Sequence, residues 1–202
     1  MKAIEILTIG LLFIGQLWPL VNQPEVELPA TSDPPVGASV TAFSQVDPRD
    51  PNDPYDIQTN WIRAVDELAS IGVDQVNFAV YRIVTDRGEL KGGPTLSTVK
   101  AAVERANQLG LTISIMPFFE TTTGWRGKYN PRGKARRNFQ VGYVRLISEL
   151  AEIKNVDRFT VASELNAMVA DPSNLPFFDK IIRTVANSSF DGDIGFLSLI
   201  HI

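Results

Sequence analysis

Cysteine is absent from the 202-residue sequence, and histidine occurs only once, as His201 next to the C-terminus. Without cysteine, the chain can form neither disulfide bonds nor a thiolate metal site. A single histidine leaves almost nothing from which to build a Ser-His-Asp triad or a zinc site. The loop after the first expected strand also lacks the glycine-rich motifs that bind nucleotide phosphates. We therefore expect no metal ion and no organic cofactor.

An excess of positive charge is missing as well. Lysine and arginine total 19 against 23 aspartate and glutamate residues, a formal net charge of −4. Nucleic-acid-binding domains usually carry a basic patch or stripe, whereas the one basic cluster here, 126–137, falls in a predicted loop and has no repeated pattern. With 44% apolar and 21% charged residues, the composition is that of a globular chain. We expect no nucleic-acid partner.

The N-terminus carries an apolar run. Met1 and Lys2 form a short positive start, and residues 6–17 are almost wholly apolar. This pattern is typical of a secretory signal, whose apolar stretch has ~7–15 residues, and it is short for a membrane span. We interpret 1–22 as a signal peptide or an uncleaved N-terminal anchor and 23–35 as a flexible linker. The protein is thus expected to be secreted, periplasmic or at the cell surface, and to contact a membrane only through an uncleaved N-terminal segment.

From residue 36 onward, β-rich runs alternate with amphipathic helical stretches. The sequence predicts strands at 36–43, 76–83, 111–119, 159–162 and 193–196. It predicts helices at 58–71, 96–109, 138–154 and 176–187. Repeated β-α-β units indicate a parallel sheet with helical crossovers.

A closed barrel and an open doubly wound sheet share this alternation. The loops after the first three strands are long, whereas the connections after helices are as short as Gly72-Val73. Barrel enzymes show this asymmetry because loops at the C-terminal ends of their strands form the active site. We predict an α/β fold in which residues 36–196 form a truncated TIM-barrel catalytic domain. Because a whole (β/α)8 barrel needs about 250 residues, this domain would contain about the first four and a half β/α units.

The C-terminal residues 197–202, with the sequence LSLIHI, match a DNA adapter. They can be encoded by CTG TCT CTT ATA CAC ATC, the mosaic-end adapter of transposase-based sequencing libraries. A natural hydrophobic strand end would have a similar composition, but the match covers all of these codons and falls where the barrel stops. We interpret 197–202 as a translated sequencing adapter and assign His201 no catalytic role.

One carboxylate follows a strand directly. The apolar strand at 159–162 continues into Ser163 and Glu164, which places the Glu164 side chain at the C-terminal mouth of the predicted barrel. Cleavage of a glycosidic bond requires a carboxylic acid that donates a proton at such a place. A glutamate that begins a helix or forms an ion pair fits the same position, so the residue type alone leaves both interpretations open.

Part of the sequence resembles glycoside hydrolase family 113, a clan A family of (β/α)8 barrels best known for β-1,4-mannanases. The resemblance spans roughly residues 36–196. Its specific part is TGWRG at 123–127, the long helix that follows, and VDRFTVASEL at 156–165. It implies a barrel glycosidase that acts on β-linked polysaccharide.

The resemblance also implies roles for individual residues. In clan A the acid/base glutamate lies at the end of strand four, usually after an asparagine, and here Ser163 stands in the asparagine position. By this match Glu164 is the general acid/base, and Trp125 and Arg126 line the sugar-binding cleft. The clan takes its nucleophile from the end of strand seven, which this sequence lacks. A retaining glycosidase needs that second carboxylate ~5–5.5 Å from the acid/base, so we expect the fragment to be inactive and its intact parent to be an enzyme.

Other residues near the strand ends are candidates for substrate contact. Trp125 lies in a glycine-flanked loop, and its ring could stack on a sugar or pack within the loop. Glu120 ends the third strand and could contact a sugar hydroxyl, influence Glu164, or lie in solvent. Tyr81, near the end of the second strand, and Asn166, just after Glu164, complete the predicted substrate-binding set.

The leading hypothesis is a hydrolase of β-linked polysaccharide, with β-1,4-mannan as a candidate substrate, working by retaining double displacement. Its partner is therefore a polysaccharide or oligosaccharide. The alternative is a non-catalytic carbohydrate-binding or cell-surface module that keeps the barrel and lacks the chemistry. A doubly wound nucleotide-binding domain is a third reading, disfavoured because the phosphate-binding glycine loop is absent.

Overall fold

The computed structural model describes three ranges of the chain: 36–41, 57–122 and 124–197. The predicted signal or anchor and the predicted linker lie outside these ranges, as does all of the predicted adapter except Leu197. None of the helices in the described ranges is both long enough and apolar enough to cross a membrane.

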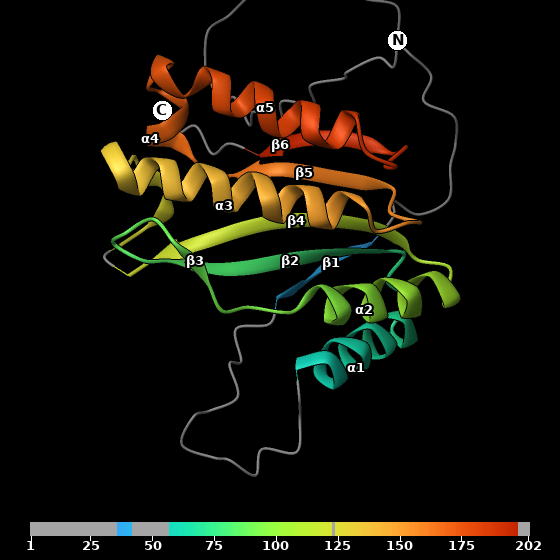
Figure 1. Ribbon diagram of the computed structural model, residues 1–202. Coiled ribbons are helices and arrows are strands. Elements are labelled where there is room, and N and C mark those ends of the chain that lie inside the picture. The colour runs from blue at the N-terminus through green and yellow to red at the C-terminus, as the bar shows by residue number, and fades with distance from the viewer. Residues whose placement is uncertain (1–35, 42–56, 123, 198–202) are drawn as a thin grey trace, which may run out of the picture.

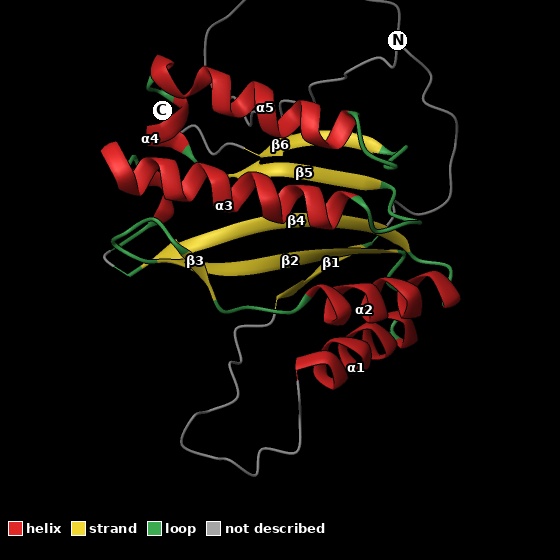
Figure 2. Cartoon of the chain, in the orientation of Figure 1, coloured by secondary structure: helices red, strands yellow, loops and turns green. Residues whose placement is uncertain are grey.

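Six strands form one sheet. Five of them are parallel and lie side by side in chain order: β1 (Gly37–Thr41), β2 (Gln75–Val84), β4 (Thr112–Thr121), β5 (Arg158–Ser163) and β6 (Asp193–Leu197). The short strand β3 (Leu90–Lys91) pairs antiparallel with the end of β2. Each parallel strand is joined to the next by a helix, as Figure 2 shows.

Four longer helices form these crossovers: α1 (Ile57–Ser70), α2 (Leu96–Gln108), α3 (Gly133–Ala151) and α5 (Leu175–Ala186). Three short helical segments lie in the connections: the 3-10 helix η1 (Arg126–Lys128), α4 (Asn166–Val169) and the 3-10 helix η2 (Pro172–Asn174). Both η1 and α4 follow the C-terminal ends of strands, and they contact each other.

The strand order decides between the two predicted folds. A doubly wound sheet reverses its strand order at a switch point, so that helices cover both faces. Here the order runs β1-β2-β4-β5-β6 without reversal, and right-handed crossovers then place every connecting helix on one face. Figure 1 shows α2, α3 and α5 over the same face of the sheet. The predicted partial barrel is confirmed, and the doubly wound alternative is wrong.

Aromatic and branched side chains bury the helix-covered face of the sheet. Phe78 of β2 stacks on Trp61 of α1, with ring centroids 5.4 Å apart. Phe119 of β4 meets Phe139 of α3 edge-on at 4.9 Å. The buried hydroxyl of Tyr143, also on α3, shares its one proton between two strand carbonyls, each 3.2 Å away, and its burial raises the pKa of this phenol. These contacts fix the helices against β2, β4 and β5.

The opposite face of the sheet is more polar and less covered. Alternate residues of a strand point to opposite faces, so Asn77, Tyr81, Phe118 and Glu120 share the face that the helices leave uncovered. Asn77 donates to Ser39 of β1 at 3.2 Å across this face. In a closed barrel this surface becomes the interior, and its upper end becomes the active-site mouth.

Most predicted elements begin or end one to five residues away from the observed bounds, and two of these differences bear on the site. β4 continues to Thr121, so Glu120 belongs to a strand rather than to a loop. α3 begins at Gly133 instead of 138, because its first turns are held by polar contacts to a distant segment, which apolar periodicity cannot reveal. β3, α4 and the 3-10 helices were not predicted; they are too short to show a period.

Candidate active site

The ends of β4 and β5 bring two glutamates onto one arginine. Arg126, the first residue of η1, donates through Nη1 to Glu120 Oε1. Its other amino group, Nη2, lies 2.6 Å from Glu164 Oε2. The side chains of Arg126 and Glu164 are only 15% and 16% exposed, against 33% for Glu120. Partial burial makes these charge-assisted contacts stronger than surface ion pairs. The predicted residues Glu120, Arg126 and Glu164 therefore form one cluster.

Trp125 contacts the same carboxylate. Its indole Nε1 donates to Glu164 Oε2 at 3.2 Å. One side of its ring packs against Gly127, where an added Cβ would lie only 2.3 Å from a ring carbon. The residue as a whole is nevertheless 39% exposed, so part of the indole is available to a ligand. Trp125 is thus held between Glu164 and a glycine that has no room for a side chain.

The backbone of Glu164 is in an unusual conformation. Its φ angle is 56°, in the left-handed region that non-glycine residues adopt infrequently. Asn155 is the other non-glycine residue with a positive φ in the described ranges, and asparagine tolerates this region better than glutamate does. The Glu164 amide donates to Leu197 O at 2.9 Å, next to a register shift between β5 and β6. Such backbone strain concentrates at functional sites.

Tyr81 joins the cluster from β2. Its ring centroid lies 5.4 Å from that of Phe118 on β4. The Arg126 guanidinium lies over the Phe118 ring, 5.1 Å from its centroid. Burial raises the pKa of the Tyr81 phenol, and the nearby Glu120 carboxylate raises it further. The phenol therefore keeps its proton at neutral pH and can donate a hydrogen bond to a ligand.

Asn166 is the first residue of α4, two positions after Glu164. It is partly buried, and α4 packs against η1, which carries Arg126. All six predicted site residues therefore lie at the same end of the sheet. Sequence reasoning missed Gly127, although an aromatic residue two positions before a glycine is compatible with a ring that packs on the backbone.

The opposite end of the sheet holds a different hollow. A cavity of about 550 Å³ opens there and is lined by Asn107, residues 155–157 and residues 191–193. Asn107 lies at the end of α2, and the other residues lie at or just before the N-terminal ends of β5 and β6. Barrel enzymes act instead at the C-terminal ends of their strands. None of the predicted site residues lines this cavity. We therefore place the candidate site at the Glu164 cluster rather than at this cavity.

Acidic residues in the described ranges do not form a metal site. No group of three or more His, Cys, Asp or Glu side chains there has an arrangement that could hold a metal ion. The two site glutamates are instead directed at the guanidinium of Arg126. Their oxygens and the phenol of Tyr81 are groups that suit hydrogen bonds to sugar hydroxyls.

Solved structures of known proteins share this fold. A β-mannanase of glycoside hydrolase family 113 from Alicyclobacillus acidocaldarius, in complex with ManMIm, matches with a TM-score of 0.55 at 18% identity, over 67% of this chain and 47% of that chain. A complex of a family 113 β-1,4-mannanase matches with a TM-score of 0.56 at 15% identity, over 72% and 50% of the two chains. A third structure, also a family 113 β-1,4-mannanase, gives 0.53 at 16% identity, over 70% and 49%.

The chain has part of a (β/α)8 fold like that of glycoside hydrolase family 113. This finding confirms the predicted fold class and the resemblance on which it partly rested. The chain spans about half the length of the solved structures that it matches. No protein-family model matches the sequence, and no curated protein matches it. At such low identity the likeness establishes the fold alone.

Proposed function

We propose that this chain is part of a glycoside hydrolase in which Glu164 is the general acid/base. The observation that carries the proposal is the position of Glu164: a partly buried carboxylate with a strained backbone, at the C-terminal end of β5, in a family 113-like barrel. Barrel enzymes place their catalytic groups at the ends of strands. A carboxyl group at this place can protonate the oxygen of a leaving sugar and later activate a water molecule.

Trp125 and Arg126 support this role through their contacts. The indole and guanidinium both donate to Glu164 Oε2, so they orient the carboxyl group toward the mouth of the sheet. The exposed part of the Trp125 ring would stack on a sugar of the substrate, because aromatic faces and the apolar faces of sugars are complementary. Tyr81 and Asn166 would contact sugar hydroxyls from the two sides of this cluster.

Glu120 is not the proposed nucleophile. The Arg126 guanidinium lies between Glu120 and Glu164 and contacts both, so it occupies the space that a sugar ring would need between an acid and a nucleophile. Retaining double displacement requires a second carboxylate about 5–5.5 Å from the acid/base. We propose that this carboxylate comes from the remainder of a complete barrel and that the described half is inactive by itself.

The proposed substrate class is β-linked polysaccharide, with β-1,4-mannan as the first candidate. The basis for mannan is that the matching solved structures are β-mannanases. A polymeric substrate is also consistent with the export that the N-terminal sequence predicts, because an exported enzyme meets polysaccharides outside the cell. We therefore propose a secreted, periplasmic or cell-surface location.

A non-catalytic carbohydrate-binding module is the second candidate. The observation that favours it is that both site glutamates are engaged by Arg126. A partly exposed indole beside fixed carboxylates is enough to bind a sugar without cleaving it. Binding of manno-oligosaccharides without any hydrolysis by a protein with the complete barrel would support this reading.

The experiment that tests the catalytic proposal is the substitution Glu164→Gln in a protein with a complete barrel. Without its acid, the enzyme should lose ~10²–10⁴-fold in kcat on β-1,4-mannan. The phenolate of an aryl β-mannoside with a very acidic phenol leaves without protonation. The substitution should therefore slow the first chemical step on this substrate much less. The measurement is steady-state and burst kinetics on both substrates.

Asp179→Asn is the matched control for this experiment. Asp179 forms an exposed ion pair with Arg183 on α5, away from the site, so its loss should change neither rate. If Glu164→Gln slowed the first chemical step equally on mannan and on the activated substrate, the acid role would be contradicted. Unchanged hydrolysis of mannan would contradict the proposed function altogether.

A further inference from the structure

Two connections carry the candidate site, and neither is a regular element. The first joins β4 to α3 and contains Trp125 and Arg126. The second joins β5 to α5 and begins with Glu164. The indole of Trp125 can reach the carboxylate of Glu164 only if these two connections keep a constant separation. The contacts that hold them together therefore determine the geometry of the site.

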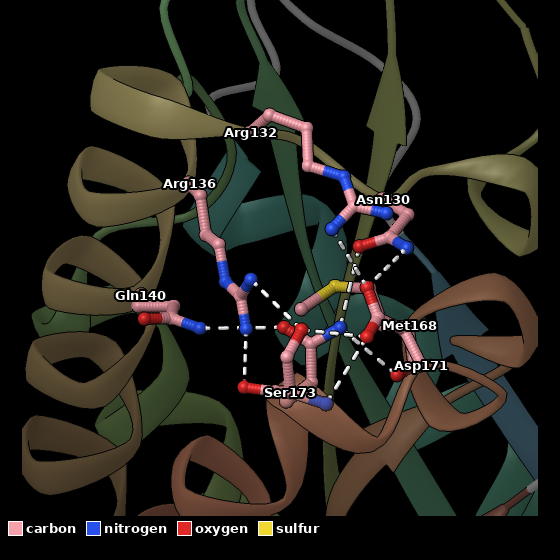
Figure 3. Close-up of polar contacts among 8 residues, drawn as sticks. Asn130, Arg132, Arg136, Gln140, Met168, Asp171 and Ser173 are labelled. Atoms are coloured by element: carbon pink, nitrogen blue, oxygen red, sulfur yellow. Dashed lines mark hydrogen bonds and ion pairs between the residues drawn. The ribbon is translucent and has the colours of Figure 1, made fainter.

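Asn130 lies in the first connection and bonds to the second one through both ends of its side-chain amide. Its Nδ2 donates to Asp171 Oδ2 at 3.0 Å. Its Oδ1 accepts from Asn174 Nδ2 at 3.2 Å. Figure 3 shows Asn130 directed at Asp171, with the Arg132 guanidinium beside it, whereas Arg136 reaches Ser173 from the other side of the network. Both the donor and the acceptor of the Asn130 amide are thus used across a sequence separation of more than 40 residues.

The partners of Asn130 are themselves fixed. Asn174 is 0% exposed, and its Nδ2 also donates to the carbonyl of Met168 at 3.0 Å. Asp171 accepts from the Ser173 hydroxyl at 2.6 Å and from Arg132 Nη1 at 3.1 Å. The hydrogen bonds from Ser173 and then from Asn130 hold the pKa of the Asp171 carboxyl well below its usual range. Asp171 is therefore an anionic acceptor at neutral pH.

The orientation of the Asn130 amide is dictated by these neighbours. If the amide were rotated by half a turn, its oxygen would face the Asp171 carboxylate and its NH₂ would face the NH₂ of Asn174. Both contacts would then be repulsive, because a carboxylate only accepts and an NH₂ group only donates. Replacing Asn130 by an isosteric carboxylate makes one of these conflicts permanent: an oxygen then faces the Asp171 carboxylate, while the other oxygen still accepts from Asn174.

We propose that Asn130 is a positioning residue, which joins the connection carrying Trp125 and Arg126 to the connection carrying Glu164. The contact that it sets is the one between the Trp125 indole and the Glu164 carboxylate. Asn130 itself does not touch the proposed reacting group. Its importance for catalysis rests on the proposed function of Glu164, whereas its effect on the geometry can be measured without any activity.

The test uses the Trp125 indole as a reporter in the 202-residue chain. The substitution is Asn130→Asp, and the measurement is the ¹⁵N–¹H spectrum of the indole groups, assigned by Trp125→Phe. The Nε1–H resonance of Trp125 should move away from its hydrogen-bonded position. The backbone amide hydrogens at 124–130 should exchange with solvent about tenfold faster, which corresponds to a change of ~1.4 kcal/mol in the free energy of local opening. The buried Trp61 indole of α1 should keep its position.

Asn138→Asp is the matched control. It introduces the same single-atom change at an asparagine of α3 that donates to Arg87 O at 2.9 Å, outside the network around Asn130. This variant should leave the Trp125 indole where it is. Asn130→Ala provides a second variant that adds no charge; it removes both hydrogen bonds and should move the Trp125 indole in the same direction by less.

Three outcomes would overturn the proposal. An unchanged Trp125 indole in both Asn130 variants would show that this network does not set the contact. A joint displacement of the Trp61 and Trp125 indoles would show a general loss of structure rather than positioning, and an equal displacement in Asn138→Asp would show that any carboxylate has the same effect. Glu164→Gln should also shift the Trp125 indole resonance, because this indole donates to the Glu164 carboxylate. None of these measurements uses enzymatic activity, so the geometric inference is tested separately from the proposed enzymatic role of Glu164.

Discussion

The ends of β4 and β5 each present a glutamate to Arg126, but they do so by different means. Glu120 lies within a regular strand, paired in register with Ile83 of β2. Glu164 lies one residue after its strand, with a left-handed backbone and beside a register shift. Glu120 is the more exposed of the two side chains, and Glu164 accepts from both Trp125 and Arg126.

The difference separates a position that regular structure supplies from one that the surroundings must enforce. A left-handed non-glycine residue costs on the order of 1–3 kcal/mol and persists only where other contacts over-determine it. At Glu164 these contacts are the two donors on its carboxylate, the Trp125 indole and the Arg126 guanidinium. The end of β5 therefore has the strained backbone that is common at functional sites, whereas the end of β4 is a regular strand.

The largest effect should come from removing each carboxylate in turn in a protein with a complete barrel. Glu164→Gln should lower kcat on β-1,4-mannan by ~10²–10⁴-fold. Glu120→Gln should lower it by only about tenfold, because Glu120 acts through Arg126 and one charge-assisted hydrogen bond is lost. The measurement is kcat and KM for both variants. A loss at Glu120 as large as that at Glu164 would remove the distinction between the two strand ends.

A second effect concerns the glycine beneath the Trp125 ring. An added Cβ at Gly127 would lie 2.3 Å from the ring, so Gly127→Ala should destabilise the protein by ~1–3 kcal/mol and move Trp125 away from Glu164. The control is Gly142→Ala in α3, where the nearest atom, in Leu90, would lie 3.4 Å from the new Cβ.

In that control, alanine should be neutral or should stabilise the helix by up to about 1 kcal/mol. Both variants are to be measured by denaturant unfolding. Equal stabilities for the two alanine variants would show that the Trp125 ring moves aside freely and that Gly127 does not hold it in place.

Substitution by glycine and by alanine should give opposite orders at the two glutamates. At 164 the backbone has a positive φ, so Glu164→Gly should be more stable than Glu164→Ala by about 1 kcal/mol. At 120 the backbone is a regular strand, so Glu120→Ala should be more stable than Glu120→Gly by ~0.5–1 kcal/mol. The measurement is the free energy of unfolding of the four variants. If alanine were more stable than glycine at 164, as expected at 120, the Glu164 backbone would not be strained.

The smallest effect is a shift in the titration of Tyr81. The Glu120 carboxylate disfavours the phenolate and so raises the pKa of Tyr81, in addition to the effect of burial. Glu120→Gln should therefore lower this pKa, while burial keeps it above its ordinary value of 10.0. The ultraviolet absorbance of the phenolate measures it, with Tyr81→Phe identifying the transition and Tyr129, whose pKa burial raises to about 12, titrating later.

Glu164→Gln should leave this transition nearly unchanged, since Glu164 is not among the causes of the shift. A larger response to Glu164→Gln than to Glu120→Gln would mean that Tyr81 faces β5 rather than β4. The order of the two responses is therefore a direct test of how the strand ends are arranged.

Sequence patterns identified the elements and most of the cluster because those features are local. The alternation of apolar runs predicted the parallel strands, and the glutamate directly after an apolar strand led to Glu164. Trp125 and Arg126 were found through a motif that the resemblance supplied. Asn130 was not found, since an asparagine in a polar loop has no distinctive local pattern, and its partners Asp171 and Asn174 are more than 40 positions away.

By itself, the sequence determined the order of strands and helices and the carboxylate that directly follows β5. These properties depend on composition and on short periodic patterns. Only the tertiary structure decided that the strand order does not reverse, that Arg126 binds both glutamates, that Gly127 packs beneath Trp125, and that α3 begins at Gly133. Each of these depends on contacts between residues of different elements, and the free energy of such contacts appears only when the sheet and its connections are assembled.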